Sequence, residues 1–206
     1  MSERTETKER ILDAFIEMAS TLGYENVTMR DIAKKVGINS ASIYYHYESK
    51  DRILEYAYEF FTRHYFDNRK SSAIMKKLIE TATAEEIIEA LSRSYESDDP
   101  KKYFRMILIN KIVYMRLFQD QVAGSMFVEN NANDARYVID IMQHGINVGR
   151  IYPDFDIVTF AEVLIGSQVA MGVKAYASPG YEICELDEKA RILAMISKLF
   201  ATALIQ

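Results

Sequence analysis

The chain has 206 residues, of which 49% are hydrophobic and 27% charged, a composition typical of one soluble domain or two small ones. The formal net charge of −5 excludes a uniformly basic nucleic-acid coat, so any DNA binding has to come from a local surface. The single cysteine excludes an internal disulfide framework and a cysteine-rich metal site. Because prolines and glycines are few, the composition favours long helices.

The sequence lacks the pattern of a secreted or membrane protein. Residues 1–6 are polar, without the apolar core of a signal peptide. The most apolar segment, residues 155–177, is interrupted by Asp156, Glu162 and Lys174, and no window offers about 20 uninterrupted apolar residues. This segment is interpreted as a buried helix of a soluble bundle, and the protein is predicted to be cytoplasmic.

The N-terminal region contains clear helix start and stop signals. Apolar residues recur at helical spacing over residues 11–22, and Gly23 follows them. Thr28 precedes a second helix, and Asp31 three residues later completes a capping box. Gly37 is placed to end that helix.

Two further helices are predicted directly afterwards. Asn39 is suited to cap a short helix over residues 40–47, and Ser49 to cap a longer one from about 50 to 66. A short helix, a turn containing glycine and a second short helix form the outline of a helix-turn-helix, whose second helix enters the DNA major groove.

The third predicted helix carries a polar and aromatic outer surface. Ile43 and Tyr47 are four residues apart and are expected to point inward. Lys50 begins the next helix, where its charge and the free backbone amides favour a phosphate. The remaining side chains are short donors and aromatic groups suited to phosphates and base edges, namely Ser40, Ser42, Tyr44, Tyr45 and His46.

The stretch Thr28–Lys50 resembles the DNA-binding signature of the TetR family of transcriptional regulators, and the similarity extends from about residue 7 to about residue 61. The resemblance implies phosphate contacts from Thr28, Tyr44 and Lys50, with Arg30 as a further contact. It implies base or near-base contacts from Ser40, Ala41, Ser42, Tyr45 and His46. Two residues depart from the family pattern, which often has glycine at the position of Ala41 and a basic residue or proline at that of Glu48.

The charge of this region is not basic overall. Residues 1–50 contain seven Lys or Arg and eight Asp or Glu. Four of the acidic residues lie on the first helix and are expected to face away from DNA; they are Glu6, Glu9, Asp13 and Glu17.

The rest of the chain is predicted to be helical, giving an all-α fold with a DNA-binding domain over 1–50 and a ligand-binding and dimerisation domain over 51–206. Helix starts are expected at Thr83 and at Asp99-Pro100. A long helix is expected over about 128–148, and two final helices over about 156–177 and 187–204. Residues 129–134 are interpreted as a solvated helix end or kink rather than a calcium loop, because the central glycine and closing glutamate are absent.

The last two helices are predicted to form a homodimer interface, as they do in the TetR family. Leu193, Ile196 and Phe200 share a stripe on the final helix, and Phe160, Leu164 and Val169 add apolar surface on the preceding one. A twofold dimer presents two recognition helices to a palindromic operator, roughly 34 Å apart.

An effector pocket is predicted from aromatic and soft residues interspersed with a few polar ones. Asn110 and His144 are polar residues on apolar segments, for which local hydrogen bonding is the alternative explanation. The full set is Tyr103, Phe104, Ile107, Asn110, Tyr114, Phe118, His144, Met171 and Tyr176.

The sequence contains none of the usual catalytic motifs and predicts no enzyme activity, no cofactor and no metal site. The resulting hypothesis is a repressor released from its operator by a small molecule. Two alternatives remain: an architectural DNA-binding protein without an inducer, for which a solidly packed body would be evidence, and an all-helical enzyme.

Overall fold

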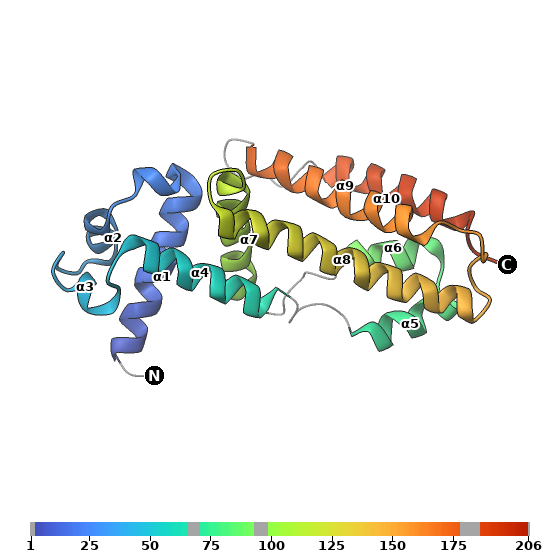
Figure 1. Ribbon diagram of the computed structural model, residues 1–206, viewed down its shortest axis with the longest axis horizontal. Helices are drawn as coiled ribbons and strands as arrows, with labels where there is room; N and C mark the ends of the chain where they lie inside the picture. The colour runs from blue at the N-terminus through green and yellow to red at the C-terminus, as the bar shows by residue number, and fades with distance from the viewer. Residues whose placement is uncertain (1–2, 66–70, 93–98, 178–185, 206) are drawn as a thin grey trace. The chain divides into compact units, whose positions relative to one another are not determined.

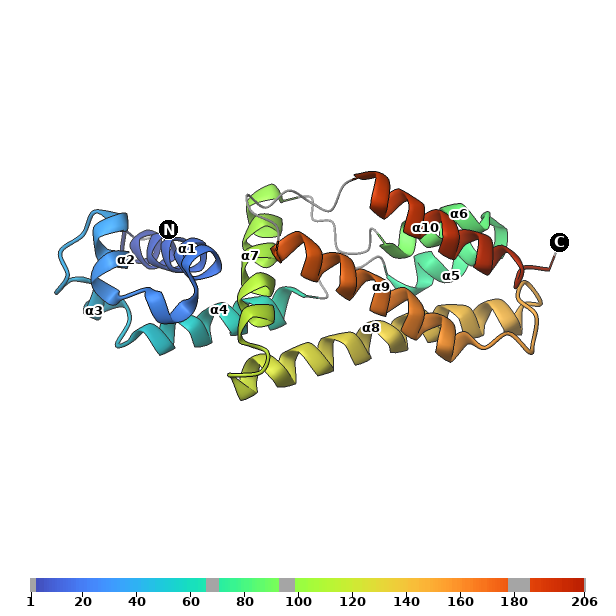
Figure 2. The ribbon, with the colours of Figure 1, turned by 90° about the horizontal axis from the view of Figure 1, so that it is seen from above.

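The computed structural model describes residues 3–65, 71–92, 99–177 and 186–205, and its regular elements are all helices (Figures 1 and 2). The prediction of an all-α fold is confirmed. Ile151 and Leu204 form an isolated antiparallel bridge. The elements are α1 Glu3–Leu22, the 3-10 helix η1 Tyr24–Asn26, α2 Met29–Val36, α3 Ile43–His46, α4 Lys50–His64, α5 Ser72–Thr81, α6 Ala84–Ser92, α7 Pro100–Arg116, α8 Gln121–Asn147, α9 Ile157–Ala177 and α10 Leu186–Ala201.

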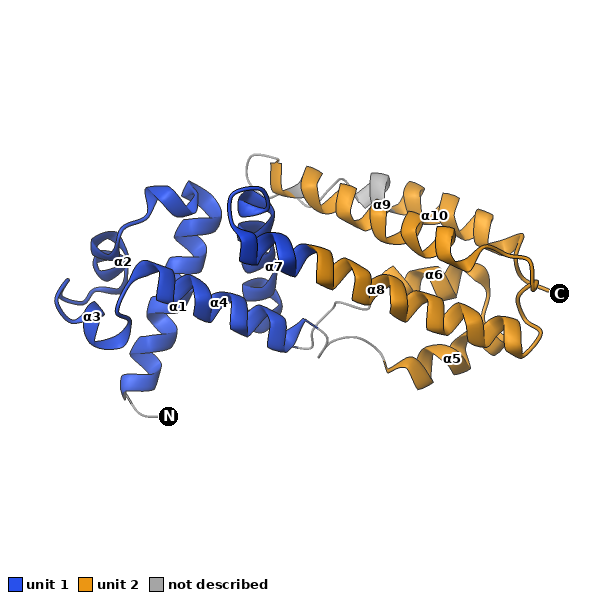
Figure 3. Ribbon diagram, viewed as in Figure 1, with its two compact units in different colours: residues 1–68, 97–127 blue, residues 69–96, 128–206 orange. Residues whose placement is uncertain are grey.

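The chain forms two compact units, which Figure 3 distinguishes by colour. Unit 1 comprises residues 1–68 and 97–127, and unit 2 comprises residues 69–96 and 128–206. Helices α4 and α7 therefore pack with the N-terminal helices. The predicted boundary at residue 50 separates a DNA-binding from a ligand-binding domain, and that division of function stays a prediction. The packing units divide the chain differently, because α4 and α7 belong to unit 1.

The core of unit 1 is built around α1, which packs against α2, α3, α4 and α7. Phe15, Ile32 and Ile43 are completely buried in it. Arg105 of α7 adds a polar tie to α1: its Nε donates to Asp13 Oδ1 at 2.8 Å and its Nη1 to Glu9 Oε2 at 2.8 Å. The N-terminal helices are thus anchored on a scaffold that includes α7.

The helix signals around α2 are confirmed. Thr28 Oγ1 accepts a hydrogen bond from the Asp31 amide, and the Asp31 carboxylate accepts one from the Thr28 amide. Gly37 ends α2 in the left-handed conformation at φ 78°. Ser49 caps α4 by accepting from the Arg52 amide at 3.2 Å.

The predicted start of the third helix at Ser40 is wrong, because α3 begins at Ile43. Asn39 Oδ1 accepts a hydrogen bond from the Ala41 amide at 2.8 Å, and the Asn39 carbonyl accepts one from Ser42. These bonds close a turn over residues 40–42, so Asn39 acts as a turn residue instead of a cap.

The central helix α8 begins at Gln121, seven residues before the predicted start. Asp120 Oδ1 accepts hydrogen bonds from the amides of Val122 and Ala123, a capping signal that the sequence interpretation missed. The expected helix end at residues 129–134 is wrong, since the segment lies inside α8 with Asn130 and Asp134 buried. Burial in the folded unit outweighs the weak helix propensity of asparagine and aspartate.

Unit 2 encloses an aromatic cluster. The rings of Phe160 and Phe200 lie 5.2 Å apart, and Phe155 contacts both. Arg150 links the C-terminal end of the chain to the segment between α5 and α6. Its guanidinium donates to the carbonyls of Ile205 at 2.6 Å and Ala82 at 3.1 Å.

The apolar stripes expected to lie at the surface belong to this core. Ile196, Phe200, Phe160 and Leu164 are 3% exposed or less within a single chain. The predicted dimer surface is therefore wrong at these four positions, whereas Leu193 and Val169 are half-buried against the same core. The exposed apolar residues of α9 and α10 lie on other faces, namely Val158, Val163, Val173, Met195 and Leu199.

Helix α9 is apolar enough to raise the question of membrane insertion. Within the described residues, Ile157–Lys174 is the one segment long and apolar enough to cross a membrane, with mean hydropathy 1.4. A third of that segment is buried, and Phe160, Ala161 and Leu164 pack into the core of unit 2. A core helix of a bundle passes the same test, so the segment is weak evidence for insertion.

Gly145 in α8 permits a close helix approach. A Cβ atom there would lie 2.6 Å from Ile151 Cδ1 and 3.1 Å from Ile79 Cδ1, and both isoleucines are fully buried. We expect Gly145→Ala to lower the free energy of unfolding by about 1–3 kcal/mol through overpacking. Urea unfolding followed by circular dichroism measures this loss. The double variant Gly145→Ala/Ile151→Val should lose less than the sum of its single variants, and a strictly additive result would contradict the steric explanation.

Candidate nucleic-acid interface

In the α2–turn–α3 segment, buried residues hold α3 in place and the predicted recognition residues lie between them at the surface. Ile43 is fully buried and Tyr47 is 5% exposed, as their spacing predicted. Tyr44 and Tyr45 between them are 56% and 67% exposed. Large aromatic side chains with this exposure leave their hydroxyl groups accessible to a partner.

Most of the residues predicted to contact DNA are exposed in the structure. His46 and Lys50 are half-buried. The other seven are exposed: Thr28, Arg30, Ser40, Ala41, Ser42, Tyr44 and Tyr45. Their contact with DNA remains a prediction.

Lys50 lies at the first turn of α4, as predicted, with its ammonium group folded onto Tyr24. Its Nζ donates to the Tyr24 carbonyl at 2.8 Å and lies 4.0 Å from the centre of the Tyr24 ring. The Tyr24 hydroxyl in turn donates to Asp51. To contact a phosphate, the Lys50 ammonium group would have to share or give up its contacts with Tyr24.

His46 is adjacent to Tyr45 in an edge-to-face arrangement, with ring centres 5.5 Å apart. Its Nδ1 is buried without a hydrogen-bond partner in the described residues. Burial lowers the pKa of His46 below its usual value, and the nearby charges of Arg4 and Lys8 lower it further. Both effects favour the neutral imidazole in the free protein.

Two basic residues of α1 are part of this surface and were missed in the sequence interpretation. Arg4 Cζ lies 4.7 Å from the centre of the Tyr45 ring. Lys8 Nζ lies 4.6 Å from the centre of the Tyr56 ring and 5.1 Å from that of Tyr47. Their i, i+4 spacing on the first helix was the available signal, but nothing in the sequence placed that face beside Tyr45.

Several acidic residues of α1 are engaged in ion pairs. Glu9 and Asp13 are bound by Arg105, and Glu17 Oε1 accepts from Lys35 Nζ at 2.8 Å. These pairs reduce the negative charge that α1 would present to a polyanion.

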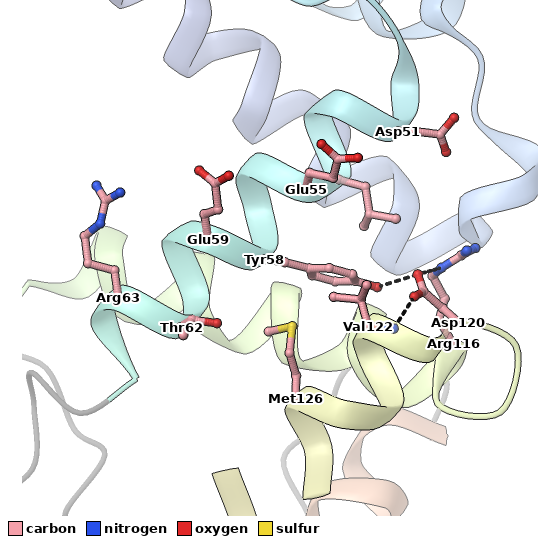
Figure 4. Close-up of a pocket in the computed structure, with 11 residues that line it drawn as sticks. Asp51, Glu55, Tyr58, Glu59, Thr62, Arg63, Arg116, Asp120, Val122 and Met126 are labelled. Carbon is pink, nitrogen blue, oxygen red and sulfur yellow. Dashed lines mark hydrogen bonds and ion pairs between the residues drawn. The ribbon is translucent and has the colours of Figure 1, made fainter. Parts of the chain in front are cut away.

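An open cavity of about 840 Å³ lies within unit 1, between α4 and the segment that joins α7 to α8 (Figure 4). The Tyr58 hydroxyl donates to Asp120 Oδ2 at 3.3 Å, and Arg116 Nε donates to the same oxygen at 3.1 Å. Burial and the Asp120 carboxylate raise the pKa of Tyr58 well above its usual value. The lining residues are Asp51, Leu54, Glu55, Tyr58, Glu59, Thr62, Arg63, Arg116, Asp120, Val122 and Met126.

None of the predicted effector-binding residues lines this cavity. In unit 1, Phe118, Phe104 and Tyr103 are 96%, 54% and 37% exposed. Ile107, Asn110 and Tyr114 are half-buried, and Tyr114 packs edge-to-face against Phe127.

The other three predicted effector residues belong to unit 2. His144 Nε2 is hydrogen-bonded to Glu80 Oε1 at 2.8 Å, so the local hydrogen bond weighed as its alternative is present. Met171 and Tyr176 on α9 are half-buried. The nine residues are divided between two units, and their common pocket remains a prediction.

Taken together, the capped α2, the left-handed turn at Gly37 and the exposed tyrosines of α3 define a helix-turn-helix DNA-binding domain. Residues 11–57 match the family model for bacterial regulatory proteins of the tetR family. Over these residues the chain is similar to the TetR family of transcriptional regulators.

Individual relatives agree over the same region. The chain is 38% identical over 69 residues to the biofilm operon icaADBC HTH-type negative transcriptional regulator IcaR of Staphylococcus epidermidis, covering 30% of this chain and 37% of the relative. It is 48% identical over 48 residues to IcaR of Staphylococcus aureus strain Newman, covering 23% and 26%. The chain thus matches between about a quarter and a little more than a third of the length of these relatives.

The fold similarity extends over the whole chain. The structure of a TetR-family transcriptional regulator from Cytophaga hutchinsonii superimposes with a TM-score of 0.64, covering 100% of this chain and 98% of that one at 14% identity. At this identity the similarity concerns the fold.

Proposed function

We propose that this protein is a sequence-specific, DNA-binding transcriptional repressor that acts as a homodimer on a palindromic operator. The observation that carries the proposal is the α2–turn–α3 segment, in which capped α2 precedes two exposed tyrosines that lie between buried Ile43 and Tyr47. The similar IcaR proteins are described as negative regulators, which supports repression.

In the proposed complex, α3 enters the major groove and α2 lies across the backbone. Thr28, Tyr44 and Lys50 bind phosphates and fix the register without reading sequence. Ser42 and Tyr45 contact base edges, and the Ala41 methyl contacts a thymine methyl. Neutral His46 donates or accepts a single hydrogen bond.

We further propose that a small molecule controls the DNA-bound population through α4. This helix starts at Lys50, directly after the recognition segment, and the cavity of about 840 Å³ runs along it from Asp51 to Arg63. A ligand that fits only one position of α4 would shift the population between DNA-competent and incompetent states. The open cavity beside α4 is the observation that supports an effector over a purely architectural role. We propose that the protein binds DNA and its effector in the cytoplasm and catalyses no reaction.

Repeated selection of random duplex DNA with the full-length protein tests this function. We expect an enriched palindrome whose half-sites are separated by about one helical turn, roughly 34 Å. Recovery of DNA without a sequence motif would overturn the proposal and favour the architectural alternative.

A further inference from the structure

The recognition segment carries no cationic side chain of its own. Residues 39–47 contain neither lysine nor arginine, and Glu48 follows them. Lys50, the first cation after the segment, is bound to the Tyr24 carbonyl. Because DNA affinity depends largely on neutralised phosphates, a cation that another element supplies beside α3 would add to the proposed contacts of Arg30 and Lys50.

Arg4, at the N-terminal end of α1, lies where that charge is needed. Its guanidinium carbon lies over the ring of Tyr45, 4.7 Å from the centre, and both residues are exposed. Tyr45 in turn packs edge-to-face on His46. Arg4, Tyr45 and His46 thus form one contiguous group made from two elements far apart in sequence.

A stacked arginine is able to perform two tasks at once. Its planar face rests on the aromatic ring, while its N–H groups point outward in the plane and remain available to phosphate oxygens. The stack also restricts the rotation of the Tyr45 side chain. Lys8, one turn further along α1, lies over the rings of Tyr47 and Tyr56 and is a second α1 cation on the same side of the domain.

We propose that Arg4 is a DNA-contacting residue that binds a backbone phosphate and holds the Tyr45 ring in position for base recognition. The inference rests on the proposed DNA-binding function and extends the interface from α2 and α3 to the start of α1. It assigns a role to a residue outside the helix-turn-helix itself.

The experiment measures the affinity of the full-length protein for two probes, the duplex selected by the wild type and a random-sequence duplex of equal length, across a salt series. We expect Arg4→Ala to weaken binding to both probes about tenfold. The slope of log affinity against log salt should become shallower by about 0.9 for each lost phosphate contact. Arg52→Ala is the matched control, because Arg52 is another exposed arginine of this unit and is paired with Glu55 on α4.

The positioning role is tested separately by Arg4→Lys, which keeps the charge and loses the planar stack. We expect it to retain most of the salt slope but to relax base preference at the position that Tyr45 reads. In a Tyr45→Ala background, Arg4→Lys should cause no further change in base preference.

The inference is overturned if Arg4→Ala changes affinity and salt slope no more than Arg52→Ala does. It also fails if Arg4→Lys leaves base preference unchanged, or alters it equally with and without Tyr45. A failure of the proposed function looks different, because the wild-type protein would then select no sequence. Circular dichroism melting of each variant checks that unit 1 remains folded.

Discussion

Replacing Val163 on α9 by glutamate is expected to convert the proposed dimer into a monomer and to reduce affinity for the palindromic duplex by about 10²–10⁴-fold. Val163 and Val173 are 46% and 47% exposed, and Gly166 and Ala170 continue the same stripe at helical spacing. On the adjacent α10, Met195 and Leu199 are 68% and 51% exposed. A twofold partner covers such a surface with a copy of itself, and a buried carboxylate would prevent that contact.

The loss is large because a monomer contacts one half-site instead of two. Light scattering at micromolar concentration should give the wild type twice 23.7 kDa and Val163→Glu a mass near 23.7 kDa. Val128→Glu, at another exposed valine of unit 2, should remain dimeric and bind DNA. A wild-type mass of a single chain, or a dimeric Val163→Glu with full affinity, would contradict this interface. Charged variants of buried Ile196 should instead unfold unit 2.

The second large effect is expected on the recognition surface. Ser42→Ala and Tyr45→Ala should each cost about 1–3 kcal/mol on the selected operator and change the preferred base at one position in each half-site. Both residues are exposed, so the truncations leave the core of unit 1 intact. Binding-site selection with each variant measures the change in preference.

Tyr44→Phe is the matched comparison, since Tyr44 is equally accessible but is assigned to a phosphate. This variant should weaken binding to specific and random duplexes by the same factor and leave the selected sequence unchanged. If both Ser42→Ala and Tyr45→Ala select the wild-type sequence, the recognition surface has been assigned to the wrong residues.

Local features of the fold were predictable because they depend on neighbouring residues. The capping box at Thr28, the left-handed turn at Gly37 and the cap at Ser49 each follow from short-range hydrogen bonds. The exposure of Tyr44 and Tyr45 around buried Ile43 follows from helical spacing alone.

Features that depend on packing between distant segments were not predictable in this way. The stack of Arg4 on Tyr45 joins residues that are 41 positions apart in the sequence. The stripe containing Ile196 and Phe200 is apolar whether it faces a partner or the core, so its pattern does not distinguish the two. Asn39 was misinterpreted because asparagine suits both a helix cap and a turn, and the backbone decided for the turn.

Specific DNA recognition is tested most directly by one ratio of dissociation constants. The wild-type protein is titrated at physiological salt with its selected duplex and with a scrambled duplex of the same length and composition. A specific regulator is expected to bind the selected duplex at least about 10³-fold more tightly. A ratio near one would contradict sequence-specific regulation by this helix-turn-helix.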